Sequence, residues 1–148
     1  MQHEPMFIML ADDDESDRLN FKDALEESKI SNTLLMLHDG VALMDYLLRE
    51  DAPLPYLLFL DLNMPRKNGL ECLREIKKQP RLANIVIAIY STSSSEKDIQ
   101  ETYLCGANVY IKKPNDFGVL KQVLTKVVSA ASVYRDTPFR IENFLFRT

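Results

Sequence analysis

YLLFLDLNMPRKNG, residues Tyr56–Gly69, is the stretch that decides the fold. Its apolar residues run without interruption until they meet Asp61, and a loop with proline and glycine follows. An apolar run without polar alternation is typical of a parallel strand that is buried on both faces. Gly69–Lys78 then carries apolar residues at helical spacing and stops before Pro80. The stretch predicts a strand, a loop and a helix, which together form the repeating unit of a parallel α/β sheet.

The same alternation of short apolar runs and longer amphipathic stretches extends along the chain. Ser93 and Glu96, three residues apart, match a capping box at the start of the fourth expected helix. Five strands alternating with five helices predict an α/β fold, a doubly wound five-stranded parallel sheet with helices on both faces. The expected strands are Phe7–Ala11, Thr33–Leu37, Tyr56–Leu60, Ile85–Tyr90 and Val109–Lys112, and the expected helices are Ser16–Ser28, Val41–Arg49, Gly69–Lys78, Glu96–Cys105 and Phe117–Ala130.

Composition narrows the class of protein. A chain of 148 residues, 46% hydrophobic and 27% charged, fits one globular domain with a real core. Its net charge of −4 gives no basic face, so we expect no direct contact with nucleic acid. Cys72 and Cys105 form no CxxC pair and lack histidine spacing for zinc, so both are expected as buried apolar residues. Met1–Pro5 has no basic run, and no apolar run could span a bilayer, which together predict a cytoplasmic protein without membrane contact.

Polar side chains stand where four of the expected strands end. Asp12 and Asp13 follow the first strand, Asp61 the third, Ser91 the fourth and Lys113 the fifth. The carboxyl ends of parallel strands meet at one edge of the sheet, where ligands bind in such folds. Three carboxylates crowded there would resist ionisation unless a cation is present, and Mg²⁺ prefers carboxylate and water oxygens. The pattern predicts an acidic site for a magnesium ion.

Taken one at a time, the polar residues at and near these strand ends have simpler explanations. Asp14, Glu15 and Asp17 are best explained as solvated acids that favour the N-terminus of the following helix. Ser91 alone could be one polar residue of a capping loop, and Lys113 alone a solvated lysine at the end of a strand. The joint placement of such residues at four strand ends favours a shared site.

Four motifs, FIMLADDD, LLFLDLNMPRKNG, IVIAIYSTSSSEKDI and GANVYIKKP, occur in an order that resembles the receiver domain of bacterial two-component response regulators. The resemblance extends from about Phe7 to Ala131 and implies a flavodoxin-like sheet with strand order 2-1-3-4-5. It implies a single-domain response regulator that accepts a phosphoryl group from a sensor histidine kinase or phosphotransfer protein. Phosphorylation would then switch a protein-interaction face, so no enzyme is expected beyond self-catalysed phosphorylation and dephosphorylation.

The resemblance also assigns roles to the acidic residues. By motif position Asp61 is similar to the phosphoacceptor of the family, and Asp12 with Asp13 to the acidic pair that holds Mg²⁺. The Mg²⁺ ligands implied are these two residues, Asp61 itself and the backbone carbonyl of Asn63. The three-aspartate run leaves the register ambiguous by one, and we place the pair directly after the apolar strand.

Further roles follow from the same motifs. Ser91 is similar to the hydroxyl residue that bonds a phosphoryl oxygen, although threonine is commoner there, and Lys113 to the lysine that pairs with that oxygen. Tyr110 matches the aromatic switch position, against which stands the simpler explanation of a half-buried strand aromatic. The resemblance implies a cis peptide bond between Lys113 and Pro114, which is uncommon even before proline.

The end of the chain is expected to differ from the rest. We divide the chain into a receiver domain, residues 1–131, and a C-terminal extension, residues 132–148, that is too apolar for a free tail. For this reason it should pack on its own domain or on another subunit. The motifs together with this short aromatic extension resemble stand-alone regulators paired with bacterial phytochrome kinases, and because such regulators often dimerise, the resemblance implies a homodimer. The aromatic residues in question are Tyr134, Phe139, Phe144 and Phe146.

Two other functions stay open on the sequence alone. A pseudo-receiver would bind partners without phosphorylation, but every expected site side chain is present. A haloacid-dehalogenase-type phosphohydrolase also forms an aspartyl phosphate with Mg²⁺. Its motif requires a second aspartate two residues after the nucleophile, where this chain has Asn63, and its nucleophile stands on the first strand rather than the third.

Overall fold

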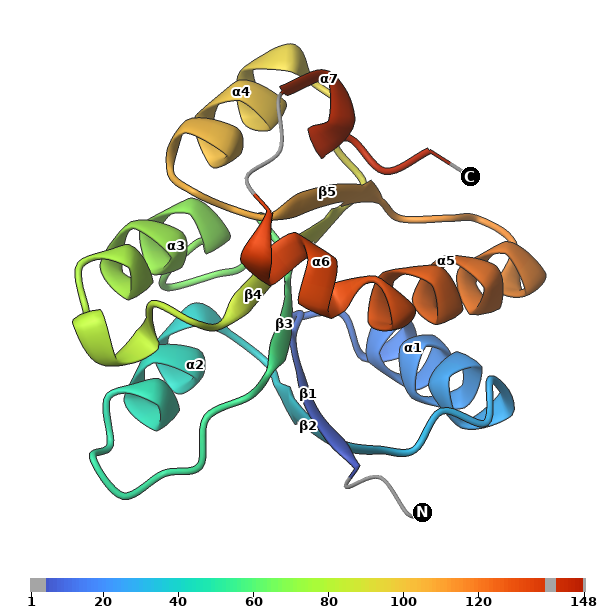
Figure 1. Cartoon of the computed structure of the whole chain (residues 1–148), viewed down its shortest axis with the longest axis horizontal. Helices are drawn as coiled ribbons and strands as arrows, with labels where there is room; N and C mark the ends of the chain where they lie inside the picture. Colours follow the sequence, from blue (N-terminus) through green and yellow to red (C-terminus); the bar gives the residue numbers. More distant parts are fainter. Residues whose placement is uncertain (1–4, 138–140, 148) are drawn as a thin grey trace.

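The computed structural model describes residues 5–137 and 141–147 and shows one five-stranded parallel sheet with helices on both faces (Figure 1). The strand order is β2-β1-β3-β4-β5, so the predicted doubly wound, flavodoxin-like sheet is confirmed. The strands are β1 (Met6–Ala11), β2 (Asn32–Leu37), β3 (Leu57–Leu60), β4 (Val86–Ser91) and β5 (Val109–Lys112). The helices are α1 (Glu15–Glu27), α2 (Gly40–Leu47), α3 (Gly69–Lys77), the 3-10 turn η1 (Pro80–Leu82), α4 (Glu96–Leu104), α5 (Phe117–Ser129), α6 (Ala131–Asp136) and α7 (Ile141–Phe144).

Alternate residues of each strand point to opposite faces and build two apolar cores. In β3, Leu58 and Leu60 pack toward α2, α3 and α4, whereas Leu57 and Phe59 pack toward α1 and α5. All four are fully buried, and burying such a side chain stabilises the fold by roughly 1.5–3 kcal/mol. Figure 1 shows α1 and α5 side by side on one face of the sheet and α2, α3 and α4 on the opposite face. Because both faces of the central strands are packed in these cores, the ends of the strands are held in fixed positions.

Side-chain caps start the five helices that flank the sheet. The capping residues are Asp14, Asp39, Asn68, Ser95 and Asp116. The predicted capping box of Ser93 and Glu96 is wrong, because Ser95 accepts the hydrogen bond from the Asp98 amide and Ser93 lies further out in the loop. Instead Ser93 Oγ donates to the Asp98 carboxylate at 2.6 Å, so this loop is tied to the first turn of α4.

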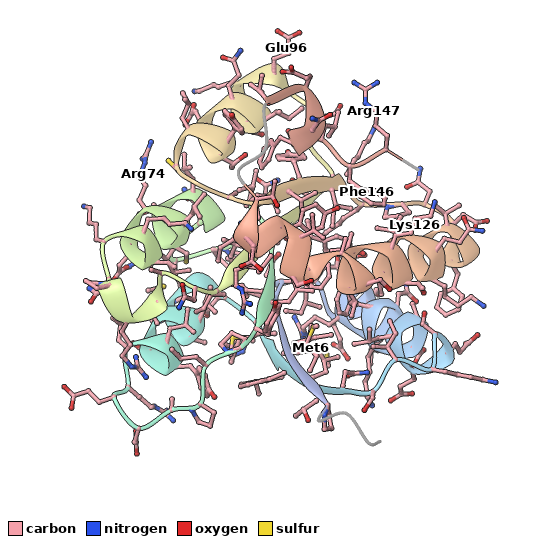
Figure 2. The ribbon with its side chains drawn as sticks, in the orientation of Figure 1. Met6, Arg74, Glu96, Lys126, Phe146 and Arg147 are labelled. Atoms are coloured by element: carbon pink, nitrogen blue, oxygen red, sulfur yellow. The ribbon has the colours of Figure 1, made fainter. Side chains whose placement is uncertain are left out.

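The segment after α7 covers the free edge of β5. Phe144 is fully buried, with its ring 5.3 Å from that of Tyr103 and 6.1 Å from that of Tyr110. Leu145 pairs with Tyr110 in a parallel bridge, and the Phe146 amide donates to the Tyr110 carbonyl at 2.8 Å. Phe144 joins the core beneath α4, and Phe146 packs on the core beneath α5, near which Figure 2 labels it. This short segment therefore extends the sheet by one strand-like pairing.

Sequence patterning did not predict η1, α6 or α7. The division at residue 131 stays a prediction, because α6 continues almost directly from α5. Residues 1–4, 138–140 and 148 of the two predicted ranges lie outside the described residues, as does the aromatic Phe139. No helix within residues 5–137 and 141–147 has the length and apolar character needed to cross a membrane.

Gly69, the first residue of α3, lies so close to the end of β3 that a larger residue should not fit. A Cβ atom at this position would lie 2.2 Å from the Asp61 carbonyl oxygen and 2.8 Å from Leu62 Cα. We expect Gly69→Ala to lower the free energy of unfolding by about 2 kcal/mol or more, because the backbone must shift. Gly118→Ala is the control, since its Cβ would meet only a side-chain oxygen of Asp116 at 3.1 Å. Urea denaturation showing equal stability for both variants would contradict this.

Candidate functional site

The predicted polar residues do meet at the carboxyl edge of the sheet. Asp12 follows β1, Asp61 follows β3, Ser91 ends β4 and Lys113 follows β5. The Asp61 amide donates to the Ala11 carbonyl at 3.0 Å, which carries the pairing of β1 and β3 one step past the strand ends. The backbone of each acid is therefore fixed by the sheet, and only its side chain has freedom to move.

Three carboxylates gather at this edge. Asp12, Asp13 and Asp61 each offer an oxygen, and these oxygens lie within 4.8 Å of one another. Asp12 and Asp61 are buried, whereas Asp13 is exposed. Asp14 is not part of the cluster, because its side chain caps α1 and accepts from the Asp17 amide at 2.9 Å. The structure thus separates the three-aspartate run into two site residues and one helix cap.

One lysine faces this cluster. Lys113 Nζ lies 2.8 Å from Asp12 Oδ2, 2.8 Å from Asp17 Oδ2 and 3.5 Å from Asp61 Oδ2, and its side chain is 8% exposed. The peptide bond between Lys113 and Pro114 is trans, so the expected cis bond is wrong. Trans is the ordinary state of a bond before proline, and the lysine reaches the acids from it.

Asp17 is the residue that the sequence analysis missed. It was explained as a solvated acid of a helix N-terminus, yet its carboxylate accepts a hydrogen bond from the ammonium group of Lys113. Its side chain is 36% exposed, so it forms the outer wall of the site.

Burial and charge shift the ionisation of the two central groups. Burial, and to a smaller extent the neighbouring Asp12 carboxylate, raise the pKa of Asp61, whereas Lys113 lowers it, and together they leave this pKa at about 6. Burial alone would lower the pKa of Lys113, but its close contacts with the Asp12 and Asp17 carboxylates outweigh this, and the net shift of the pKa is upward. The lysine therefore stays charged, and Asp61 titrates just below neutral pH.

The donor set fits a hard divalent cation. Asp12 Oδ2 is buried and accepts no hydrogen bond of good geometry among the described residues, although Lys113 forms an ion pair with it. Such buried oxygens usually have a partner, and carboxylates are the ligands that Mg²⁺ and Mn²⁺ prefer. A cavity of about 580 Å³ opens beside the cluster, with Asp13 and Asn63 in its lining. The cluster is therefore accessible from solvent.

Ser91 and Tyr110 both hold the loop between β4 and α4. Ser91 is fully buried, its hydroxyl accepts from the Ser93 amide at 3.1 Å, and its carbonyl accepts from the Lys113 amide at 2.8 Å. Tyr110 is fully buried rather than half-buried, and its hydroxyl donates to the Ser93 carbonyl at 2.9 Å. A change at Ser91 would therefore be transmitted through this loop to Tyr110.

Comparisons with known proteins agree with this geometry. The family model of the response regulator receiver domain matches residues 8–125. Response regulator Rcp1 of Synechocystis sp. is 34% identical over 137 residues, which cover 90% of this chain and 91% of Rcp1. A chemotaxis protein CheY homologue of Campylobacter jejuni is 29% identical over 86% of this chain and 95% of its own length.

Solved structures give the same result. The phosphorylated cyanobacterial phytochrome response regulator RcpA superposes with a TM-score of 0.80 and 33% identity, covering 86% of this chain and 94% of that one. The Mn²⁺-bound form of Rcp1 superposes with a TM-score of 0.77 and 33% identity, covering 90% and 96% of the two chains. With most of its length matched by the family model, this chain belongs to the receiver domain family of response regulators.

Proposed function

We propose that this chain is a phosphorylation-controlled signalling protein in which Asp61 accepts a phosphoryl group from a sensor histidine kinase or phosphotransfer protein. One observation carries the proposal. The buried Asp61 carboxylate lies within a few ångströms of two further acids and of one buried lysine, at the carboxyl edge of the sheet. Membership in the receiver family supports the same role.

For phosphoryl transfer, the protein has mainly to place the reacting groups and to balance their charge. An ionised Asp61 oxygen attacks phosphorus, the phosphorus–nitrogen bond of the donor phosphohistidine breaks, and its electron pair stays on the imidazole, which takes up a proton from solvent. The product is an acyl phosphate on Asp61. Bound Mg²⁺, held by Asp12, Asp13, Asp61 and the Asn63 carbonyl, would supply positive charge to the transferring oxygens. The Mn²⁺-bound form of Rcp1 supports a divalent ion in this role.

Lys113 and Ser91 would respond to the new phosphoryl oxygens. Lys113 is charged and already within 3.5 Å of Asp61, so it can balance the added negative charge. The buried Ser91 hydroxyl can donate to a phosphoryl oxygen once it releases the Ser93 amide. This would draw the β4–α4 loop inward, and Tyr110, bonded to the same loop, would carry the change to α4, β5 and α5.

We propose that this chain acts in the cytoplasm and that its partners are other proteins. The net charge of −4 offers no attraction for nucleic acid, and the acidic site itself would repel a phosphate backbone. We also propose that residues 132–148 form an extension whose apolar side chains pack on the domain or on a second copy of the chain. The burial of Phe144 against Tyr103 and Tyr110 supports the first arrangement and is compatible with exchange between copies.

Incubation with acetyl phosphate and Mg²⁺ should give one acid-stable, base-labile phosphate per chain, measured by intact mass. Asp61→Asn should give none, because the acceptor oxygen is lost. Asp14→Asn is the matched control, since it removes a neighbouring acid that only caps α1 and leaves a good capping residue. An adduct that persists in Asp61→Asn would contradict the assignment. Steady turnover of phosphomonoesters would instead support a phosphohydrolase. The absence of any adduct in the original protein would support an adaptor that binds partners without phosphorylation.

Mg²⁺ affinity should depend on pH, because Asp61 must lose its proton to become a ligand. With a pKa raised to about 6, Asp61 is ionised at pH 7.5 and largely protonated at pH 5 in the metal-free protein. Calorimetric titration should show affinity falling by about tenfold over this range. A carboxylate of ordinary pKa would give almost constant affinity over the same range. His38→Gln should keep the dependence, which excludes the nearest exposed histidine as its source.

Removing Ser132–Thr148 tests the extension. If the extension joins two copies, the full chain should have a dimeric mass by light scattering, and the shortened chain a monomeric mass. A monomeric mass for both would contradict the dimer. Phe144→Ala keeps the chain length and should weaken the same association, because the buried ring is the main apolar contact at the β5 edge.

A further inference from the structure

The lysine of the site is held chiefly by a residue other than the phosphoacceptor. Lys113 Nζ donates to Asp17 Oδ2 at 2.8 Å, whereas its contact with Asp61 Oδ2 is stretched to 3.5 Å. Its approach to Asp12 is as close as to Asp17, but Asp12 Oδ2 receives no hydrogen bond of good geometry. In this state the strongest directed bond of the ammonium group therefore runs to α1.

Asp17 also stands apart from the acids that could share an ion. The oxygens that lie together belong to Asp12, Asp13 and Asp61, and Asp17 is not among them. A divalent cation on those three acids would compete with Lys113 for Asp12. It would leave Asp17 free to keep the ammonium group, since Asp17 approaches the lysine from the outer side.

A purely structural ion pair is the simpler explanation. Partly exposed ion pairs contribute little to stability, and this one joins α1 to the residue that follows β5. A structural pair would be indifferent to what is bound at Asp61. Lys113, however, is 8% exposed and lies nearer to Asp17, at 2.8 Å, than to Asp61, at 3.5 Å, so a closer pair with a group on Asp61 would compete with its bond to Asp17.

We propose that Asp17 is a positioning residue, which holds Lys113 against α1 while Asp61 is unmodified and competes with the phosphoryl group for it afterwards. This rests on the function proposed above. The Asp17 carboxylate then sets how readily the lysine moves onto the modified acceptor. Replacing the carboxylate by an amide should weaken its hold, because a hydrogen bond between two charged groups is roughly twice as strong as a neutral one.

Beryllofluoride, which binds carboxylates as a non-covalent phosphoryl mimic, provides the test. Its dissociation constant would be measured on the full chain at saturating Mg²⁺ by fluorine NMR. We expect Asp17→Asn to bind the mimic about three- to tenfold more tightly than Glu15→Gln. Glu15 is the matched control, because it is an exposed acid of the same helical turn, and no ion pair involves it among the described residues. Comparison with it removes the general effect of losing one negative charge.

The same pair of changes in a Lys113→Ala background separates positioning from charge. There the two variants should change affinity equally, because no lysine remains to be released. Asp17→Glu keeps the negative charge, so its affinity for beryllofluoride should stay closer to that of the original protein than the affinity of Asp17→Asn does. This comparison shows whether the effect of Asp17→Asn comes from the lost charge or from a disturbed fold.

Equal effects of Asp17→Asn and Glu15→Gln with Lys113 present would overturn the proposal. So would a difference that persists without Lys113. If the original chain bound no beryllofluoride and formed no acyl phosphate, the proposed function would fall and this inference with it. Binding without coupling between positions 17 and 113 would overturn the inference alone.

Discussion

Repulsion between buried carboxylates at the ends of β1 and β3 is the constraint on which the site depends. The sheet register places Asp12 and Asp61 side by side, and both side chains are buried. The Asp12 carboxylate helps to raise the pKa of Asp61, and nearby positive charge opposes this effect. Lys113 supplies that charge from β5, and a divalent ion would supply more. The site is thus built to take up cations, and a phosphoryl group adds to the negative charge that they balance.

The same edge connects the site with the far side of the sheet. Ser91 is both the last residue of β4 and the acceptor for the Ser93 amide, and Ser93 accepts from Tyr110 on the neighbouring strand. Tyr110 in turn contacts Phe144 and pairs with Leu145. A short path of direct contacts therefore runs from Ser91, at the carboxyl edge of the sheet, to the C-terminal segment. Each step is a hydrogen bond or a packed ring, so movement at one end has a physical route to the other.

The sequence predicted the sheet well, because four of its strands, β1, β3, β4 and β5, are mostly or fully buried and therefore carry dense apolar runs. Leu57–Leu60 and Val86–Ser91 coincide with their predictions to within one residue at each end. The gathering of Asp12, Asp13, Asp61 and Lys113 was also foreseen, since topology alone brings strand ends together.

What escaped prediction depends on side-chain direction or on tertiary contact. Asp17 looked like any acid of a first helical turn, and only the reach of Lys113 from β5 gives it a partner. Ser93 had capping-box spacing, but the backbone enters α4 two residues later, so Ser95 became the cap. The helices α6 and α7 are short and are stabilised by what they pack on, which local propensity does not record.

The covered edge of β5 affects how readily the chain could aggregate. An outer strand with unpaired amides and carbonyls is a template on which other chains can add, and such addition leads to aggregates. Leu145 and Phe146 occupy part of that template. A protease that clipped the last few residues would expose the strand together with the apolar ring pocket of Tyr103 and Tyr110. Leu145 and Phe146 thus leave less of the β5 edge open for pairing with another chain.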